Sequence, residues 1–282
     1  MTTRAAFQFF QEKIHAIYDD GEARSLARIV FEDVFQTKNF QSDGPFSIEN
    51  QSKLNQLISR LLTNEPLQYI LGEADFFGFK FRVNPSVLIP RQETEELVAA
   101  ALRFLSQLPE NQEVRALDIG TGSGCIPIVL KKKMPRLEVW AIEKSHAALD
   151  VAAENAARHF TPIRFEQMDF LETQNWSQLP DFQAIISNPP YIPTAEKRLM
   201  SPRVLDFEPP EALFVKNEEP LIFYKNIASF AAEKLEKGGA LFLECNEFNA
   251  HEVLQLVENQ GFTSAELIND LAGKERIVQA IL

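Results

Sequence analysis

The sequence has few of the residues that form metal centres or disulfide frameworks. Among its 282 residues it has two cysteines, Cys125 and Cys245, and four histidines that are scattered along the chain. No pair of them has the spacing of a metal-binding motif. A structural zinc site and a disulfide-stabilised fold are therefore not expected, and we predict no metal ligands.

Long hydrophobic runs are absent as well. No stretch approaches the ~18 uncharged apolar residues that a membrane-spanning helix needs. The N-terminal segment carries Glu12, Asp19 and Asp20 between its apolar positions, which is not the pattern of a leader peptide. These absences predict a soluble cytoplasmic protein with no membrane partner.

Positive charge is also scarce. The chain has 28 basic and 40 acidic residues, which gives a formal net charge of −12. The one basic run, Lys131–Lys133, fits the last turn of a helix, where cations meet the negative end of the helix dipole. Because non-specific affinity for nucleic acid comes from clustered lysine and arginine, this balance argues against a nucleic-acid duplex as the main partner.

The length allows one large α/β domain with a smaller appendage, since single domains usually contain ~100–150 residues. The first part of the chain has apolar residues at helical spacing, beginning with Phe7, Phe10 and Ile14. Residues 1–72 are therefore predicted to form a small helical domain.

Residues 73–90 have a different pattern. Phe77, Phe79 and Phe81 recur at every second position, with Gly78 between the first two, which is typical of a short strand or hairpin. We interpret this segment as a β-hairpin connector. Its aromatic side chains are expected to pack at the hinge between the two domains rather than to stack on nucleotide bases.

From residue 91 to residue 282, predicted strands alternate with predicted helices. This order indicates an α/β fold of the Rossmann-like kind, with a mainly parallel sheet covered by helices on both faces. The strands are expected near 114–119, 138–142, 163–167, 183–187, 240–245 and 276–281. The helices are expected near 93–107, 125–133, 146–158, 220–236 and 249–260.

A glycine-rich loop follows the first of these strands directly. It reads Gly120-Thr121-Gly122-Ser123-Gly124 and leads into an apolar helix. Glycines let the backbone approach a ligand closely, and a helix N-terminus offers free N–H groups. The spacing differs from the Gly-x-Gly-x-x-Gly of dinucleotide enzymes, so a pyrophosphate site is the weaker interpretation, which the motif alone leaves open.

Three acidic residues and a phenylalanine are predicted to lie at the carboxyl edge of the sheet, near the glycine-rich loop. Glu143 ends the second strand, where a carboxylate can accept hydrogen bonds from both ribose hydroxyls. Asp169 and Phe170 follow the third strand and are expected to hold an adenine amino group and to stack on its ring. Asp118 precedes the glycines and could face a positive charge such as a sulfonium. A solvated strand end for Glu143 and a turn-capping role for Asp118 are the alternatives.

The fourth strand leads into Asn188-Pro189-Pro190-Tyr191 at the same edge. Prolines stiffen the turn and have no N–H of their own, so nearby carbonyl groups remain free acceptors. The Asn188 side-chain oxygen and the Pro189 carbonyl can each accept one N–H of a planar amide or amine, and Tyr191 can cover its face. The turn alone leaves an adenine amino group and a glutamine amide almost equally open.

Taken in order, these motifs resemble the class I methyltransferases that modify exocyclic or amide nitrogen. Within that group the chain resembles most closely the release factor glutamine methyltransferases, and the resemblance spans nearly the whole chain. The further segments that support it are Glu65–Gly72, Leu88–Glu95, Phe207–Leu213 and Gly273–Arg276.

This resemblance implies methylation of the glutamine in the Gly-Gly-Gln motif of peptide chain release factors, with S-adenosyl-L-methionine as cofactor. Residues 1–72 would help to bind the release factor, and Ile89–Arg91 would form part of the cofactor wall. The catalytic and substrate-binding residues would be Asn188, Pro189, Pro190 and Tyr191. The cofactor-binding residues would be Asp118, Gly120, Thr121, Gly122, Ser123, Gly124, Glu143, Asp169, Phe170 and Asn188.

Two alternatives compete with this hypothesis. An adenine-N6 methyltransferase acting on DNA or RNA could use the same turn for a flipped adenine, but it needs a basic groove or a target-recognition domain. A binding module that keeps the cofactor fold but catalyses no reaction is the second alternative. It would be expected to have a degraded glycine loop or a degraded acceptor turn, as we call Asn188–Tyr191. The sequence shows both motifs intact and neither a basic groove nor a target-recognition domain.

Overall fold

The computed structural model describes residues 1–282, which fall into two compact units. The first unit consists of Met1–Gly72 together with Ser201–Phe207, and the second consists of Glu73–Met200 together with Glu208–Leu282. None of the helices combines the length and hydrophobicity that crossing a bilayer requires.

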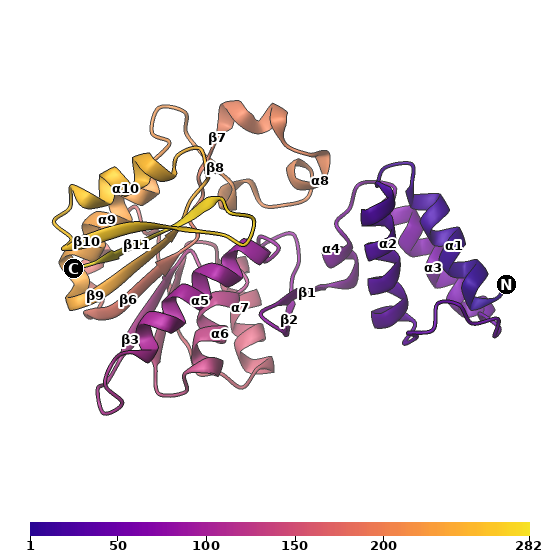
Figure 1. Ribbon diagram of the computed structural model, residues 1–282, viewed down its shortest axis with the longest axis horizontal. Helices are drawn as coiled ribbons and strands as arrows, with labels where there is room; N and C mark the ends of the chain where they lie inside the picture. Colours follow the sequence, from indigo (N-terminus) through magenta and orange to yellow (C-terminus); the bar gives the residue numbers. More distant parts are fainter. The chain divides into compact units, whose positions relative to one another are not determined.

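The first unit is helical, as the sequence predicts (Figure 1). Three of its helices begin at residues whose side chains accept a hydrogen bond from the first turn, Thr2, Asp19 and Ser47. Such capping satisfies backbone N–H groups that have no partner within the helix. The elements are α1 (Thr3–Ile14), α2 (Asp20–Ile29), a π-helical turn (Val30–Val34), α3 (Ile48–Leu61) and α4 (Leu67–Leu71).

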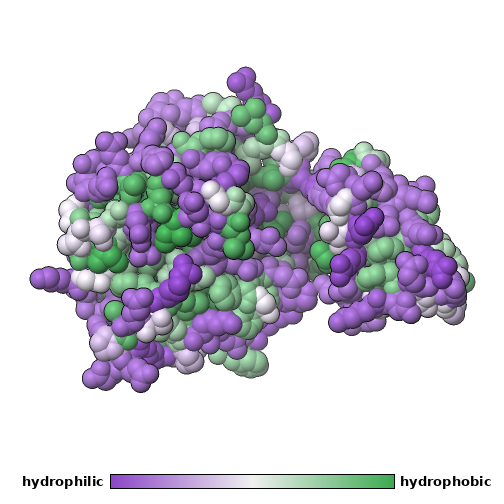
Figure 2. Space-filling view, in the orientation of Figure 1, coloured by the Kyte–Doolittle hydropathy of each residue, from purple (hydrophilic) through white to green (hydrophobic).

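Phenylalanine side chains fill the core of the first unit. Phe31 is fully buried and contacts the rings of Phe7, Phe35 and Phe46 at centroid distances of 5.2–5.6 Å. Hydrophilic residues cover most of the visible face of this unit, with only small hydrophobic patches among them (Figure 2). The many phenylalanines of the N-terminal region therefore serve packing.

The segment Ser201–Phe207, which includes the one-turn helix α8 (Pro202–Leu205), belongs to the first unit although it lies far along the chain. The Arg203 guanidinium lies 4.0 Å from the centroid of the Tyr18 ring and forms an ion pair with Glu22. Arg203 also donates a hydrogen bond of 3.3 Å to the Ile17 carbonyl. A cation–π contact, an ion pair and a hydrogen bond thus hold this segment on the helices.

The second unit begins with the expected β-hairpin. Strands β1 (Glu73–Phe76) and β2 (Phe79–Arg82) pair antiparallel around a two-residue turn, Phe77-Gly78, in which both residues have positive φ. That turn geometry matches the twist of the paired strands. Phe76 and Phe81 are buried in a core cluster of the second unit, where they pack with residues of its sheet and helices.

A seven-stranded sheet forms the centre of the second unit, in the order β10-β11-β9-β6-β3-β4-β5. The five strands from β9 to β5 in this order are parallel, as predicted for a Rossmann-like α/β fold. Their bounds are β3 (Arg115–Ile119), β4 (Glu138–Glu143), β5 (Arg164–Gln167), β6 (Phe182–Ser187) and β9 (Leu235–Glu244).

Helices cover both faces of this sheet (Figure 1). One hydrophobic cluster joins the sheet to α5 (Gln92–Ser106), α6 (Cys125–Lys133) and α7 (His146–Arg158). The other joins it to α9 (Ile222–Lys234) and α10 (Ala250–Glu258). Each predicted helix is present, and Lys131–Lys133 form the last turn of α6 as expected.

One long strand is missing from the sequence-based prediction. Residues Ser264–Asn269 form β10, which pairs antiparallel with β11 (Glu275–Ile281), and β11 pairs antiparallel with β9. As an edge strand, β10 has no fully buried residue, so the hydrophobic signal that marks the central strands is weak there. The remaining short strands, β7 (Ile192–Pro193) and β8 (Phe214–Val215), pair with each other.

Asn155 on α7 links the hairpin to the glycine-rich loop. Its fully buried side chain accepts a hydrogen bond from the Arg82 backbone N–H at 2.7 Å and donates to the carbonyls of Arg82 and Ser123, both at 2.9 Å. We expect Asn155→Ala to lower the free energy of unfolding by about 2–4 kcal/mol, because it leaves buried backbone groups without partners.

The neighbouring Glu154 supplies a matched control. It also contacts Arg82, but through an ion pair between half-exposed side chains. Such a pair contributes below about 1 kcal/mol, so Glu154→Ala should leave the urea unfolding midpoint almost unchanged. Equal destabilisation by the two substitutions would contradict the assigned role of Asn155.

Candidate functional site

The register of the parallel strands brings four distant residues to one edge of the sheet. Ile119 on β3 lies opposite Ile142 on β4 and Ser187 on β6, and Ser187 lies opposite Leu243 on β9. The next residue of each strand therefore stands at the same level. These residues are Gly120, Glu143, Asn188 and Glu244.

The glycine-rich loop adopts conformations that only glycine accepts easily. Gly120, Gly122 and Gly124 all have positive φ, and a Cβ at Gly124 would lie 3.1 Å from the Ala152 Cβ of α7. The Gly120 and Thr121 N–H groups both donate to the Ile142 carbonyl. The loop is thus held against β4 by its backbone before α6 begins.

Glu143 ties this loop to the start of α7. One of its carboxylate oxygens accepts from the Gly122 N–H at 3.0 Å, and the other accepts from the Ser145 N–H at 2.9 Å. A carboxylate oxygen has two lone pairs, so each retains capacity for a further donor. Ribose binding by Glu143 is compatible with this arrangement and stays a prediction.

Asp118 and Thr121 hold buried polar atoms that form no hydrogen bond of good geometry. Both oxygens of the fully buried Asp118 carboxyl and the Thr121 hydroxyl are in this state. Burial raises the pKa of Asp118 to about 7 and the charge of Glu143 adds to the rise, while the nearby Thr121 hydroxyl opposes it. Because unsatisfied buried polar groups are rare, they point to a ligand with donors or a positive charge nearby.

Asp169 and Phe170 lie at the end of β5, as predicted, but both have partners within the protein. The Asp169 carboxylate forms an ion pair of 2.7 Å with Lys144, which lowers its pKa, and accepts from the Leu171 N–H. The Phe170 ring stacks on Trp176 at a centroid distance of 5.2 Å. Contacts of these two side chains with adenine remain predictions.

The acceptor turn begins at Asn188, which lies level with Gly120 and Glu143 at the edge of the sheet. Ser187, just before it, donates its hydroxyl to the Ile119 carbonyl at 2.7 Å, which fixes the end of β6 to β3. Pro189 is buried, and Tyr191 packs against a core cluster of the second unit, where burial raises its pKa well above the usual range. This packing makes the turn rigid.

A cavity of about 600 Å³ brings most of these motifs together, a volume typical of small-molecule sites. Among the predicted residues, those that line it are Gly120, Gly122, Glu143, Asp169, Phe170, Asn188 and Pro190. Six predicted residues do not line it. Thr121, Ser123, Pro189 and Tyr191 each adjoin a lining residue in the chain, whereas Asp118 and Gly124 lie two positions from one. The free polar atoms of Asp118 and Thr121, the glycine loop and the cavity size all fit S-adenosylmethionine.

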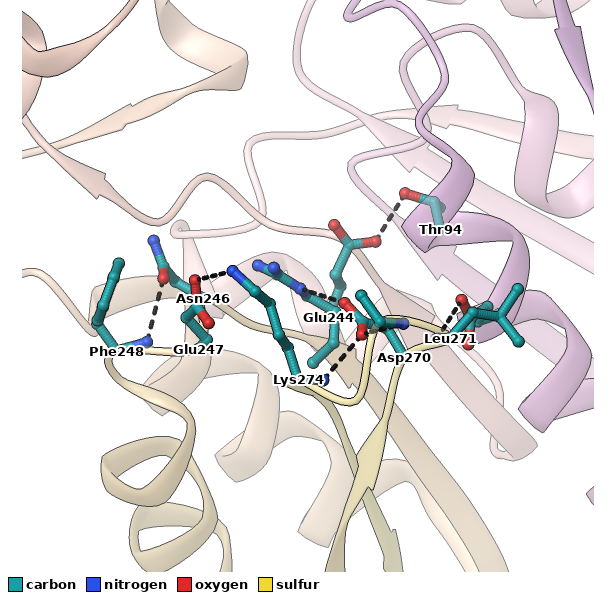
Figure 3. Close-up of polar contacts among 11 residues, drawn as sticks. Thr94, Glu244, Asn246, Glu247, Phe248, Asp270, Leu271 and Lys274 are labelled. Carbon is teal, nitrogen blue, oxygen red and sulfur yellow. Dashed lines mark hydrogen bonds and ion pairs between the residues drawn. The ribbon is translucent and has the colours of Figure 1, made fainter.

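The first turn of α5 carries polar residues that the sequence-based site prediction lacks. Thr94 donates its hydroxyl to the buried Glu244 carboxylate at 2.6 Å (Figure 3) and accepts from the Asn188 side-chain N–H at 3.0 Å. On the same turn, Glu95 and Glu96 accept backbone N–H groups from Phe77 and Leu271. Thr94 and Glu244 are 150 positions apart, so only the packing of α5 against the end of β9 shows that they meet.

Arg91, at the start of this helix, forms a partly buried ion pair. Its guanidinium lies 2.5 Å from the Glu208 carboxylate, whose side chain is 2% exposed. Glu208 also accepts from the Ile89 N–H at 3.3 Å. The pair joins two segments whose neighbouring residues, Ser86–Leu88 and Pro209, line the cavity.

Solved structures with the same fold include a methyltransferase from Pyrococcus furiosus, which is 20% identical with a TM-score of 0.50 and covers 79% of this chain and 95% of its own. The 16S rRNA N2 G1207 methyltransferase of Thermus thermophilus, solved with AdoMet and guanosine, is 19% identical with a TM-score of 0.51. It covers 74% of this chain and 49% of its own. These likenesses confirm the class I methyltransferase fold.

Two family models match the chain, the PrmC N-terminal domain over residues 5–72 and the Methyltransferase small domain over residues 94–202. A release factor glutamine methyltransferase of Flavobacterium psychrophilum is 36% identical over 274 residues, covering 96% of this chain and 95% of the relative. Its counterpart in Bacteroides thetaiotaomicron is 37% identical and covers 96% and 97%. With the glycine loop, the acceptor turn and this full-length similarity, the chain belongs to the release factor glutamine methyltransferase family.

Proposed function

We propose that this chain transfers a methyl group to the side-chain nitrogen of the glutamine in the Gly-Gly-Gln motif of peptide chain release factors. The observation that carries the proposal is the shared cavity, which Asn188 and Pro190 of the acceptor turn line together with the glycine loop and Glu143. Curated relatives of nearly equal length bear the name of this activity.

The residues of the chain would act by positioning. S-Adenosylmethionine, the methyl donor of this family, supplies an electrophilic methyl group when it is bound. Asn188 donates one side-chain N–H to the Thr94 hydroxyl, so its side-chain oxygen remains to accept an N–H of the acceptor. With the Pro189 carbonyl accepting the other N–H, the amide nitrogen is held in one orientation.

This arrangement suits a poor nucleophile. The lone pair of an amide nitrogen is delocalised into its carbonyl, and binding both N–H groups favours the pyramidal form that can attack a methyl group. The proton becomes acidic as the new N–C bond forms, so no strong base is needed beforehand. Positioning and electrostatic stabilisation would therefore supply most of the rate.

The helical first unit would contribute to binding the release factor, since its match to the PrmC N-terminal domain covers almost its whole continuous part. Release factors act in translation termination, so we place the activity in the cytoplasm. The net charge of −12 supports a protein substrate over a nucleic acid. Methylation of the adenine N6 amino group in DNA or RNA is the second candidate.

Mass spectrometry of a release factor incubated with the protein and S-adenosylmethionine tests the substrate. We expect the peptide containing Gly-Gly-Gln to gain ~14 Da on its glutamine, one methyl for one hydrogen. A release factor with that glutamine changed to alanine is the control. Methyl transfer to DNA or RNA, with none to the release factor, would show that the nucleic-acid alternative is right.

The acceptor turn is tested by Asn188→Ala. Losing the Asn188 oxygen should reduce kcat by a factor of about 30–1000, equivalent to about 2–4 kcal/mol of transition-state stabilisation. Asn111→Ala, in an exposed loop before β3, is the matched control and should leave steady-state kinetics unchanged. Unaltered kcat in the Asn188 variant would remove Asn188 from the mechanism.

The cofactor site is tested by Asp118→Asn. Because burial raises the pKa of Asp118 to about 7, the folded protein carries a poorly solvated carboxylate above that pH. We expect the variant without ligand to melt at least about 2 °C higher at pH 8. The difference should vanish below pH ~4, where the carboxyl is protonated in both states.

The same variant should bind S-adenosylmethionine more weakly, by about tenfold in titration calorimetry, since it loses a negative charge near a cationic ligand. Glu166→Gln, an exposed carboxylate on β5, is the control for both measurements. Tighter binding by the Asp118 variant would show that this carboxyl does not face the positive end of the cofactor.

A further inference from the structure

Two hydrogen bonds connect the acceptor turn to a buried carboxylate on another strand. The Asn188 side-chain nitrogen donates to the Thr94 hydroxyl oxygen at 3.0 Å, and the Thr94 hydroxyl donates to a Glu244 carboxylate oxygen at 2.6 Å. Thr94 is 3% exposed and Glu244 is 2% exposed. Water is thus largely excluded from this pair.

The chemistry of the three groups fixes the direction of both bonds. An ionised carboxylate can only accept, so it takes the single proton of the Thr94 hydroxyl. The Thr94 oxygen can then only accept from its second neighbour, which must be the NH2 end of the Asn188 amide. The oxygen of that amide is left for the acceptor in the cavity.

We propose that Thr94 and Glu244 are positioning residues that hold the Asn188 amide with its oxygen toward the acceptor nitrogen. This inference rests on the proposed role of Asn188 as a hydrogen-bond acceptor for the glutamine NH2 group. Without the pair, the amide could turn about its terminal bond and present its NH2 group to another NH2 group, which two donors cannot satisfy.

The charge of Glu244 decides the direction. Protonated Glu244 can donate to the Thr94 oxygen, which frees the Thr94 hydroxyl to donate to the amide oxygen of Asn188. This relay of two hydrogen bonds can then run in reverse, which turns the NH2 end of the Asn188 amide to the cavity. Ionised Glu244 therefore fixes the productive orientation, whereas protonated Glu244, which can donate or accept, permits both orientations.

Several neighbouring groups shift the pKa of the Glu244 carboxyl. Burial raises the pKa of Glu244 to about 7 and the charge of Glu93 adds to the rise, while the Thr94 hydrogen bond, Arg276 and Arg91 oppose it. Tyr224 donates its hydroxyl to the backbone carbonyl of Glu244, which does not titrate. The titratable and charged groups that face the carboxyl are Arg91 and Glu93 of the α5 start, Tyr191 of the acceptor turn, Tyr224 of α9, Cys245 after β9 and Arg276 of β11.

Two substitutions at Thr94 test the role of its hydroxyl group. With saturating S-adenosylmethionine and release factor, Thr94→Val should lower kcat by about 10- to 100-fold, as when partners that orient a functional side chain are removed. The KM for the release factor should change far less. Thr94→Ser keeps the hydroxyl and should restore most of the rate, whereas Thr263→Val, at an exposed threonine of the second unit, should have no effect.

The carboxylate is tested by the pH dependence of kcat. The wild-type rate should fall as pH decreases through about 7, because protonated Glu244 no longer fixes the direction of the two hydrogen bonds. Glu244→Gln cannot titrate, so this inflection should be lost. The inflection should persist in Asp118→Asn, whose carboxyl also has a pKa of about 7 in the parent protein.

Nuclear magnetic resonance provides a measurement that does not depend on the substrate. The Asn188 side-chain NH2 signals, assigned by their loss in Asn188→Ala, should shift with a midpoint near pH 7 in the wild type and not in Glu244→Gln. If the wild type methylates no release factor, the proposed function fails while this titration still tests the relay. Unchanged Asn188 signals in Thr94→Val, or a rate that Thr94→Ser does not restore, would overturn it.

Discussion

Parallel strand pairing is the constraint on which the site depends. The register places the residues at the carboxyl ends of β3, β4, β6 and β9 at one level, although up to about 120 positions separate them in the sequence. Gly120, Glu143, Asn188 and Glu244 are neighbours for this reason alone. Each strand contributes one function to the shared edge, so the cofactor loop, the acceptor turn and a buried carboxylate meet without any of them being close in the chain.

Local patterns predicted most of the fold because the central strands and helices are either fully buried or clearly amphipathic. The helices over 125–133 and 146–158 have the expected ends, and β3 differs by one residue. The edge strand β10 could not be predicted, since half of its positions are exposed and it bears a charged residue and an asparagine. The alternation of polar and apolar residues covers only Ser264–Leu267, which is the shortest run that indicates a strand.

Some residues of the site could likewise be predicted from local sequence motifs, and others could not. The glycine loop, Glu143 and the acceptor turn are contiguous motifs with chemistry that can be read from residue types. The polar residues in the first turn of α5 do not form such a motif, because Thr94 gains its importance only from its hydrogen bond to Glu244, 150 positions away. Phe170 shows the opposite case, in which a plausible motif residue turns out to have an aromatic partner, Trp176, inside the protein.

The small segment Ser201–Phe207 has a consequence for how the chain can be divided. It supplies the Arg203 guanidinium that covers the Tyr18 ring and neutralises Glu22 in the helical unit. A fragment that ends at Gly72 lacks this cation and exposes the ring face that it covers. The N-terminal helices are therefore not a transferable module, because an insertion between β7 and β8 completes them, and domain exchange between relatives would have to carry both pieces together.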